Sequence, residues 1–148
     1  MPDGKNIFVV TRDGLDIARF MAEVSDPAFG AVASFLGTVR SPNLGETVLY
    51  IDYEGYEAMI KTQMQVMADE LRRGLELGHL VLAHRLGKLK PGEASIAIVA
   101  SSKHRKDALL ACQTGIDRAK DLLPVWKYEV TEKSQTWVKG NSSASTPL

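Results

Sequence analysis

The sequence predicts an α+β fold, in which strands and helices mix without the regular strand–helix–strand rhythm of α/β proteins. Short apolar or alternating runs are typical of strands, and they lie at residues 7–11, 30–40, 48–54, 80–86 and 94–100. Two longer runs, 60–75 and 107–123, carry apolar residues at the spacing of amphipathic helices. A chain of 148 residues with 45% hydrophobic content is typical of a single domain with its own core, here expected at residues 1–138.

The first part of the chain predicts an edge strand, a short helix and a buried strand. Residues 7–11 form a short apolar run, and residues 16–24 have helical spacing until Asp26-Pro27 breaks the pattern. Residues 30–40 are almost entirely apolar, as expected of a strand that is buried on both faces. Gly37 within this run indicates a bulge or a close backbone approach.

A loop, a strand and the first long helix follow. Residues 41–46 combine proline, asparagine and glycine, which predicts a mobile loop directly after Arg40. Residues 48–54 alternate as a half-exposed strand. One face of that strand carries Leu49, Ile51 and Tyr53. The apolar stripe of the helix is formed by Ile60, Met64, Met67, Leu71 and Leu75. We expect this helix to end at Gly78.

The second half predicts two strands and the second long helix. Residues 80–86 and 94–100 are joined by residues 87–93, a connection rich in turn formers but too long for a two-residue hairpin. One of the two serines at 101–102 can cap the next helix, which Pro124 must end.

The residues after that proline alternate as a strand. One face carries Trp126, Tyr128 and Val130, and the other carries Val125, Lys127 and Glu129. The polar segment 139–148 is expected to be a disordered tail.

The charges balance, with 18 Lys plus Arg and 18 Asp plus Glu. A nucleic acid or an anionic membrane surface is therefore not an expected partner, and any basic site must be local. No apolar run approaches the roughly 18 residues of a membrane span, and the N-terminus lacks the charged-then-apolar order of a signal peptide. We therefore expect a cytoplasmic protein.

The cysteine and histidine residues predict neither a disulfide nor a metal site. Cys112 is the single cysteine and lies on an apolar helical stripe, where burial raises the pKa of a thiol and disfavours a nucleophilic role. His79 and His84 are five residues apart in a strand-like run, so their side chains point to opposite faces. We expect Cys112 to be inert, both histidines to be structural or surface residues, and the protein to need no metal or cofactor.

Consecutive basic or potentially basic side chains occupy residues 103–106, where the strand at 94–100 gives way to the second long helix. Cations are unfavourable at a helix N-terminus unless an anion binds there, because the helix dipole and the free N–H groups already favour negative charge. The segment therefore indicates an anion site, such as a site for a phosphate-bearing small molecule. A solvated basic surface is the alternative.

Four segments, in this order, resemble the large-subunit family of molybdopterin synthases. They are GAVASFLGTVR at 30–40, HRLGKLKPGE at 84–93, SSKHR at 101–105 and AKDLLPVWKYE at 119–129. The match covers nearly all of the chain before the polar tail. The resemblance implies an α/β hammerhead-type fold with a mixed or antiparallel sheet and two main helices.

The resemblance also implies an activity and partners. Members are catalytic subunits that form a central homodimer with one small subunit at each end, a 2+2 heterotetramer. The small subunit is a ubiquitin-like protein whose C-terminal Gly-Gly bears a thiocarboxylate. Its tail reaches into the large subunit and transfers sulfur to cyclic pyranopterin monophosphate, which yields the dithiolene of molybdopterin.

Carried over residue by residue, the resemblance implies a substrate pocket formed by Thr38, Val39, Arg40, His104, Arg105, Lys120, Lys127, Tyr128 and Glu129. Lys120 and Lys127 would be catalytic: Lys120 suits a general acid/base, and Lys127 an electrostatic stabiliser beside Arg40. Each has a structural alternative. Lys120 also complements the C-terminal dipole of its helix, Lys127 could be a snorkelling strand residue, and Arg40 could form a surface ion pair.

The spacing along the second long helix predicts a site built from two copies of the chain. His104 and Lys120 are 16 residues apart, which separates them by roughly 24 Å on a continuous helix. One pterin-sized substrate cannot span that distance, so His104 and Arg105 would come from the partner of a two-fold dimer. A kink near Gly115 is the alternative.

Two other functions compete with sulfur transfer. A non-catalytic docking module for a ubiquitin-like partner needs a tail-binding groove but no cluster of lysines. A phosphate-ester hydrolase usually needs a metal-binding carboxylate cluster or an activated nucleophile, and neither spacing is present.

Overall fold

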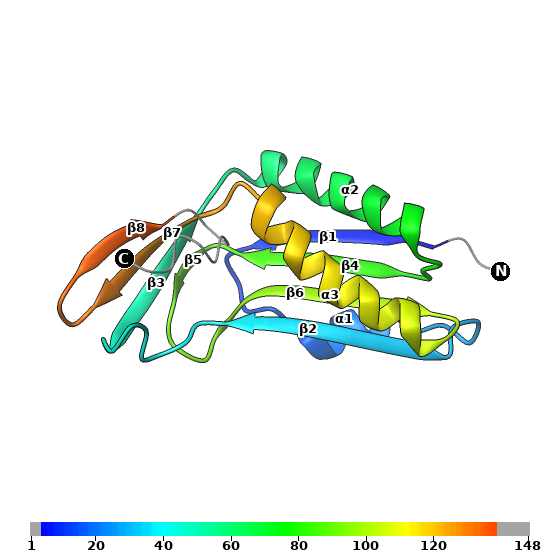
Figure 1. Ribbon diagram of the computed structural model, residues 1–148, viewed down its shortest axis with the longest axis horizontal. Helices are drawn as coiled ribbons and strands as arrows, with labels where there is room; N and C mark the ends of the chain where they lie inside the picture. The colour runs from blue at the N-terminus through cyan, green and yellow to red at the C-terminus, as the bar shows by residue number, and fades with distance from the viewer. Residues whose placement is uncertain (1–3, 139–148) are drawn as a thin grey trace.

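The structure is a computed structural model that describes residues 4–138. Within this part, the strands form two four-stranded sheets, and the helices cover the first of them (Figure 1). In chain order the elements are β1 (Asn6–Thr11), α1 (Ile17–Val24), β2 (Ala31–Thr38), β3 (Val48–Glu54), α2 (Glu57–Gly74), β4 (Leu80–Arg85), β5 (Gly87–Leu89), β6 (Ala94–Ser102), α3 (Arg105–Leu122), β7 (Trp126–Thr131) and β8 (Gln135–Val138). The α+β class predicted from the sequence is confirmed.

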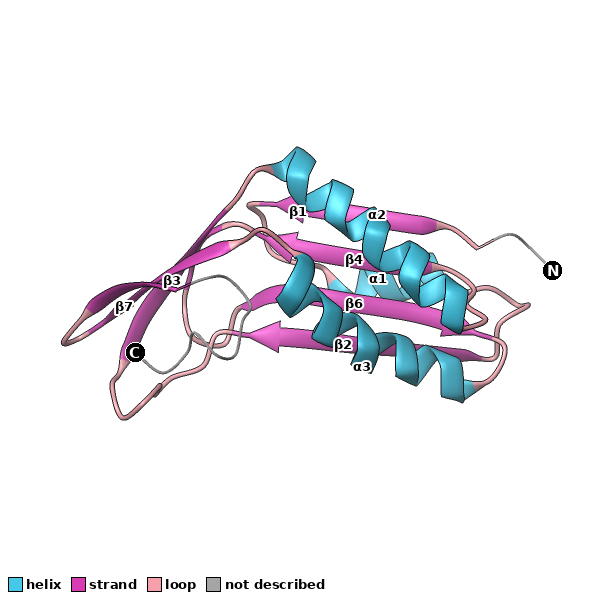
Figure 2. Cartoon of the chain, turned by 45° about the horizontal axis from the view of Figure 1, so that its top comes forward, coloured by secondary structure: helices cyan, strands magenta, loops and turns pink. Residues whose placement is uncertain are grey.

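The first sheet has the strand order β1-β4-β6-β2, with β1 parallel to β4 and the other neighbours antiparallel. The helices α2 and α3 lie across one face of this sheet, and α1 lies on the other (Figure 2). Alternate residues of the central strands therefore enter two cores. Leu80, Leu82, Ile96 and Ile98 face α2 and α3, while Val81, Ala83, Ala97 and Val99 pack with Phe20 and Val24 of α1.

The predicted stripe of α2 forms the centre of the larger core. Ile60, Met64, Met67 and Leu71 are each at most 2% exposed, which confirms that the methionines fill the core. The helix ends at Gly74, before the predicted Gly78. Leu75 follows the helix as its C-cap and donates its backbone N–H to the carbonyl of Leu71.

The second sheet has the order β5-β3-β7-β8, antiparallel throughout, and it stands at one end of the first sheet (Figure 1). Ile51, Tyr53 and Leu89 of this sheet join the larger core. The short strand β5 was not predicted, because its three residues lie inside a turn-rich connection. The second sheet thus closes one end of the layer formed by β2, β6 and α3.

The strand β2 is an edge strand, so the prediction that residues 30–40 are buried on both faces is wrong. It pairs only with β6, and Val32, Ser34 and Thr38 are exposed. Ala33 and Phe35 on the face toward α3 pack against the larger core. Val32 and Leu36 lie on the other face, and these apolar side chains made the run look uniformly apolar. The central, doubly buried strands are β4 and β6.

Two local irregularities shape the strands near the sheet junction. The register between β2 and β6 shifts at Gly37, as predicted, and a Cβ on Gly37 would approach Cγ2 of Ile96 to 2.6 Å. A second shift between Val48 and Tyr50 breaks the alternation of β3. Leu49 therefore lies exposed, whereas Ile51 and Tyr53 are buried together as expected.

The N-cap residue of α3 is His104 and not one of the two predicted serines, although a donor of the first turn is still paired by Ser102. Its Oγ accepts the backbone N–H of Ala108 at 2.9 Å in the first turn. The helix begins at Arg105, two residues earlier than predicted, with His104 as the N-cap residue, and Leu123 and Pro124 follow its end. A free donor of the first turn is thus paired by a serine that lies outside the helix.

No helix among residues 4–138 combines the length and the apolar character that crossing a membrane requires. The predicted tail at 139–148 lies outside the described residues.

Candidate active site

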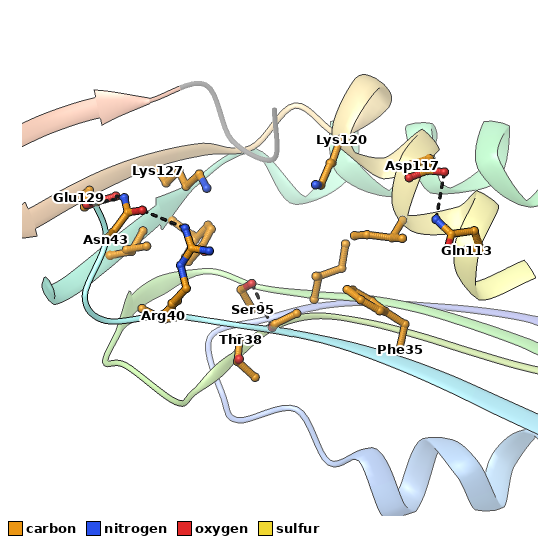
Figure 3. A pocket seen from close by; sticks show the side chains of 16 residues that line it. Phe35, Thr38, Arg40, Asn43, Ser95, Gln113, Asp117, Lys120, Lys127 and Glu129 are labelled. Atoms are coloured by element: carbon orange, nitrogen blue, oxygen red, sulfur yellow. Dashed lines mark hydrogen bonds between the residues drawn. The ribbon is translucent and has the colours of Figure 1, made fainter. Parts of the chain in front are cut away.

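A pocket of about 670 Å³ opens where the end of the first sheet, the C-terminal half of α3 and the second sheet meet. Its polar lining consists of Thr38, Arg40, Asn43, Tyr53, Ser95, Gln113, Asp117, Lys120, Lys127 and Glu129. Its apolar lining consists of Phe35, Gly37, Val39, Ile51, Ile96 and Ile116. Figure 3 shows the basic side chains on one half of this pocket and Phe35 with the Gln113–Asp117 pair on the other.

Lys127 and Glu129 enter the pocket from β7, because alternate residues of a strand share a face. Glu129 is 7% exposed and Lys127 is half-buried. Burial lowers the pKa of Lys127, Glu129 opposes that shift, and the positive charges of Lys120 and Arg40 add to it. The pocket therefore holds an ammonium group whose charge is costly to maintain without a nearby anion.

Arg40 reaches Glu129 through Asn43. Nη2 of Arg40 donates to Oδ1 of Asn43 at 2.9 Å, and Nδ2 of Asn43 lies 3.1 and 3.2 Å from the two carboxylate oxygens of Glu129 (Figure 3). Asn43 is 7% exposed. A guanidinium, an amide and a carboxylate thus form one hydrogen-bonded line along the pocket wall.

Lys120 projects from the last turn of α3 toward Lys127 (Figure 3). The helix reaches this position by packing its small residues closely on the first sheet. Those buried small residues are Ala108, Ala111, Cys112, Gly115 and Ala119. A Cβ on Gly115 would lie only 3.1 Å from Cδ1 of Ile98. This close packing fixes the end of α3, and with it Lys120, over the pocket.

Thr38 and Val39 line the base of the pocket at the end of β2. Val39 is buried, donates its backbone N–H to the carbonyl of Glu93 at 2.9 Å and accepts the N–H of Gly92 at 2.7 Å. These two bonds tie the start of the Arg40 loop to the connection between β5 and β6. The backbone directly before Arg40 is thereby held in place.

His104 and Arg105 lie outside this pocket, at the opposite end of α3, and both are exposed. The helix is continuous from Arg105 to Leu122, and Gly115 lies inside it without a break. The kink considered from the sequence is therefore absent. One chain does not bring these two residues to Lys120, whereas it does bring together Thr38, Val39, Arg40, Lys120, Lys127 and Glu129.

Tyr128 also lies outside the lining of this pocket, and its assignment to the substrate site stays a prediction. Its ring packs on Trp137 with centroids 4.9 Å apart, and its hydroxyl donates to Oε1 of Gln135. As a neighbour of Lys127 and Glu129 on β7, Tyr128 must point to the other face of the second sheet. The alternation read from the sequence had already placed it there.

Several pocket residues were not singled out from the sequence, notably Asn43, Ser95 and Tyr53. The Oγ of Ser95 donates to the carbonyl of Gly37 at 3.3 Å, and burial raises the pKa of Tyr53. Asn43 was read only as a turn residue, because its partner Glu129 is 86 positions away. Local composition carries no signal for a pairing over this distance.

Cys112 and the histidines are structural, as predicted. Burial raises the pKa of Cys112 to about 11, so the thiol stays protonated at neutral pH. His79 is buried, accepts the backbone N–H of Lys5 at 3.0 Å and lies 3.3 Å from a carboxylate oxygen of Asp26. His84 is fully buried, with its ring edge-on to Tyr53. No cluster of metal-binding side chains occurs in the described range.

Comparison with known proteins identifies the family. The model of the MoaE protein family matches residues 10–122. A rice protein (Oryza sativa subsp. indica) named molybdopterin synthase catalytic subunit is 42% identical over 123 residues, which cover 83% of this chain and 64% of the rice protein. The chain thus spans about two thirds of that relative.

Solved structures show the same relationship. The crystal structure of molybdopterin synthase from Staphylococcus aureus has a TM-score of 0.84 at 29% identity, covering 88% of this chain and 95% of the other. A complex of subunits 1 and 2 of the molybdopterin-converting factor from Helicobacter pylori has a TM-score of 0.72 at 25% identity, covering 97% and 94%. The family match over residues 10–122 includes β2, β3 and α3 and ends before β7, and the chain belongs to the MoaE protein family.

Proposed function

We propose that this chain is the catalytic subunit of molybdopterin synthase, a sulfurtransferase of molybdenum cofactor biosynthesis. Its sulfur donor is the thiocarboxylated C-terminus of a small ubiquitin-like subunit, and its acceptor is cyclic pyranopterin monophosphate. The observation that carries the proposal is the convergence of Arg40, Lys120 and Lys127 on one pocket in a member of this family. The cytoplasmic location expected from the sequence belongs to the same proposal.

The chemistry exchanges sulfur for oxygen. In each of two transfers the thiocarboxylate sulfur forms a carbon–sulfur bond to the pterin side chain and a pterin carbon–oxygen bond breaks. Water then cleaves the bond between that sulfur and the acyl carbon of the donor, which leaves the donor as a carboxylate. No net oxidation or reduction is needed. The reaction requires proton delivery to the departing oxygen and stabilisation of negative charge, which the lysine and arginine side chains that line the pocket supply.

The geometry supports distinct roles for the two lysines. Lys120 is exposed at the pocket mouth, on a helix end that leaves its side chain free to approach a reacting group, so we assign it proton transfer. Lys127 is half-buried beside Glu129, so we assign it, with Arg40, the stabilisation of negative charge. Thr38 and Val39 shape the base of the substrate site.

His104 and Arg105 join the site in this proposal from a second copy of the chain. The continuous helix from Arg105 to Leu122 supports this arrangement, because 15 residues of α-helix between Arg105 and Lys120 extend over roughly 22 Å. A two-fold dimer would place the basic helix start of each copy beside the pocket of the other. There the guanidinium and the free N–H groups of the helix start suit a cyclic phosphate.

The donor tail would enter the same pocket. A Gly-Gly terminus is the narrowest peptide that a channel can admit, and its backbone groups can pair along the way. The Helicobacter pylori complex of subunits 1 and 2 is consistent with a small-subunit partner. We propose a 2+2 assembly with a central dimer of this chain.

A docking module for a ubiquitin-like partner is the second candidate function. It accounts for a pocket that receives a tail, but it gives no reason for three cations beside a buried carboxylate. Placing such charges together carries an electrostatic cost that a binding groove for a neutral Gly-Gly segment would not need.

Reconstitution tests the proposal. Purified protein, a thiocarboxylated small subunit and cyclic pyranopterin monophosphate are mixed, and the dithiolene product is detected by oxidation to a fluorescent pterin derivative. We expect product with the intact partner and none when its two terminal glycines are deleted. Binding of the intact partner without any product would favour the docking module, and product with the truncated partner would rule out the tail as the sulfur carrier.

A further inference from the structure

Asn43 is the most completely bonded side chain of the pocket wall. It accepts one hydrogen bond from Arg40 and directs its amide nitrogen at both carboxylate oxygens of Glu129. The side chain is 7% exposed, so water does not satisfy it in place of these partners. Its two neighbours carry opposite charges and come from different elements, the loop after β2 and the strand β7.

The amide can take only one orientation here. A guanidinium has donors alone and an ionised carboxylate has acceptors alone, so the oxygen of Asn43 must face Arg40 and its nitrogen must face Glu129. A flipped amide would set donor against donor and acceptor against acceptor. Asn43 therefore matches the charge on each side with the opposite end of its dipole.

The position of Asn43 separates two groups that would otherwise attract each other. Guanidinium and carboxylate groups readily form a direct two-pronged ion pair. Within residues 4–138 Arg40 forms no ion pair with a carboxylate, and its one hydrogen bond to a side chain goes to Asn43. The remaining guanidinium N–H groups are thus left for a ligand.

We propose that Asn43 is a positioning residue, which keeps Arg40 from pairing directly with Glu129 and so preserves Arg40 for the anionic substrate and Glu129 for Lys127. This inference rests on the proposed function, since the anion in question is cyclic pyranopterin monophosphate. Asn43 touches no reacting atom in this account. It acts through the two charged residues that it separates.

The backbone of the loop holds Asn43 independently of its side chain. Asn43 and Glu46 exchange two backbone hydrogen bonds, of 2.9 and 3.0 Å. Leu44 and Gly45 between them have φ values of 50° and 78°, the left-handed conformation of a tight two-residue turn. The Oγ of Ser41 accepts the N–H of Val48 at 2.9 Å and fastens the loop to β3. A substitution at Asn43 therefore leaves the backbone bonds of the turn in place.

The test compares Asn43→Ala with the control Ser41→Ala in the reconstituted enzyme. Ser41→Ala removes one hydrogen bond of the same loop but none of the Arg40–Asn43–Glu129 line. In Asn43→Ala we expect Arg40 to turn onto Glu129. The KM for cyclic pyranopterin monophosphate, and its Kd measured by calorimetry, should rise about tenfold or more, as for the loss of a charge-assisted hydrogen bond. Ser41→Ala should leave both constants within about twofold of wild type.

The pH profile separates positioning from a merely structural role. The titratable or charged groups that share the pocket with Lys127 are Arg40, Tyr53, Asp117, Lys120 and Glu129. Pairing Glu129 with Arg40 weakens the support that Glu129 gives to the charge of Lys127. The alkaline limb of the kcat/KM profile, where Lys127 loses its proton, should therefore move to lower pH in Asn43→Ala. If Asn43 were needed only for folding, its substitution would lower the amount of active enzyme and leave the alkaline limb unmoved.

Asn43→Asp provides a second variant of nearly the same shape, should the alanine protein fail to fold. It adds a negative charge beside Glu129, in the pocket that also holds Lys127, so the alkaline limb should move to higher pH, opposite to the alanine variant. The assignment would be overturned by any of three results. The first is an Asn43→Ala protein with unchanged KM and an unmoved alkaline limb. The second is a Ser41→Ala protein whose KM and Kd rise as much as those of Asn43→Ala, and the third is an unmoved alkaline limb in Asn43→Asp. If wild type binds the pterin but makes no dithiolene, the proposed function fails, while the Kd comparison still decides the role of Asn43.

Discussion

Lys127 and Glu129 lie two residues apart on β7 and point into the same pocket, where the carboxylate supports the charge of a half-buried ammonium group. Burial and the nearby cations of Lys120 and Arg40 act against that charge. A protein that needed only a stable fold would gain from an apolar side chain at this position. We therefore infer that Lys127 lowers the free energy of unfolding and that its role lies in the pocket and not in the stability of the fold.

This cost predicts a pH-dependent stability. In the folded protein the pKa of Lys127 lies below its ordinary value of 10.5, which it keeps in the unfolded chain. Between the folded and the unfolded pKa, the unfolded chain therefore binds more protons than the folded protein. The free energy of unfolding then rises with pH over this range. Lys127→Met should remove this rise and make the protein more stable than wild type at pH 7.5, while turnover falls. Urea unfolding at pH 7.5 and at pH 10 measures the effect. Lys61→Met, at a solvent-accessible position on α2, is the control. Equal stability of wild type and Lys127→Met at pH 7.5 would contradict the interpretation.

Lys120→Ala should lower the rate of product formation by about 10² to 10⁴, the usual loss for a positioned proton-transfer group. The protein should still fold, because Lys120 is exposed and lies outside the buried stripe of α3. Single-turnover kinetics with a saturating partner measures the chemical step, and circular dichroism checks the fold. A variant with more than about half of the wild-type rate would remove Lys120 from the mechanism.

Cys112→Ala should cost roughly 1 kcal/mol of stability and leave turnover intact. The thiol is buried against the carbonyl of Ile98 and its raised pKa keeps it protonated, so it cannot carry sulfur as a nucleophile. Thermal unfolding and product assays on the same preparation separate the two effects. Lost turnover in a well-folded Cys112→Ala protein would show that the sulfur passes through this chain.

Mixed dimers test whether the site uses two copies. His104→Ala and Lys120→Ala proteins, each inactive alone, are co-assembled with different affinity tags and purified through both. We expect activity to return, since one of the two sites in a mixed dimer would be wholly wild type. Verified mixed dimers without activity would place both residues in the pocket of a single chain.

The sequence predicted the elements whose pattern is local. The stripe of α2 and the shared face of Lys127 and Glu129 follow from periods of 3.6 and 2 residues, which depend on nothing outside each element. The same alternation placed Tyr128 on the other face, and only the family resemblance added it to the site.

Features set by distant contacts were not predictable in this way. An apolar run cannot reveal whether it has one neighbouring strand or two, so β2 was expected to be doubly buried, although it lies at the sheet edge. Asn43 is typical of a turn, and its function in the pocket depends on Glu129, which arrives from β7. Long-range pairing of this kind leaves no mark in local composition.

The most direct test of the central claim follows the sulfur itself. The small subunit is prepared with ³⁵S in its C-terminal thiocarboxylate and mixed with this protein and cyclic pyranopterin monophosphate, and the label is counted in the isolated pterin. We expect two labelled sulfur atoms per pterin with wild type and almost none with Lys120→Ala. Label that stays on the small subunit or appears as free sulfide with the wild-type protein would contradict that claim.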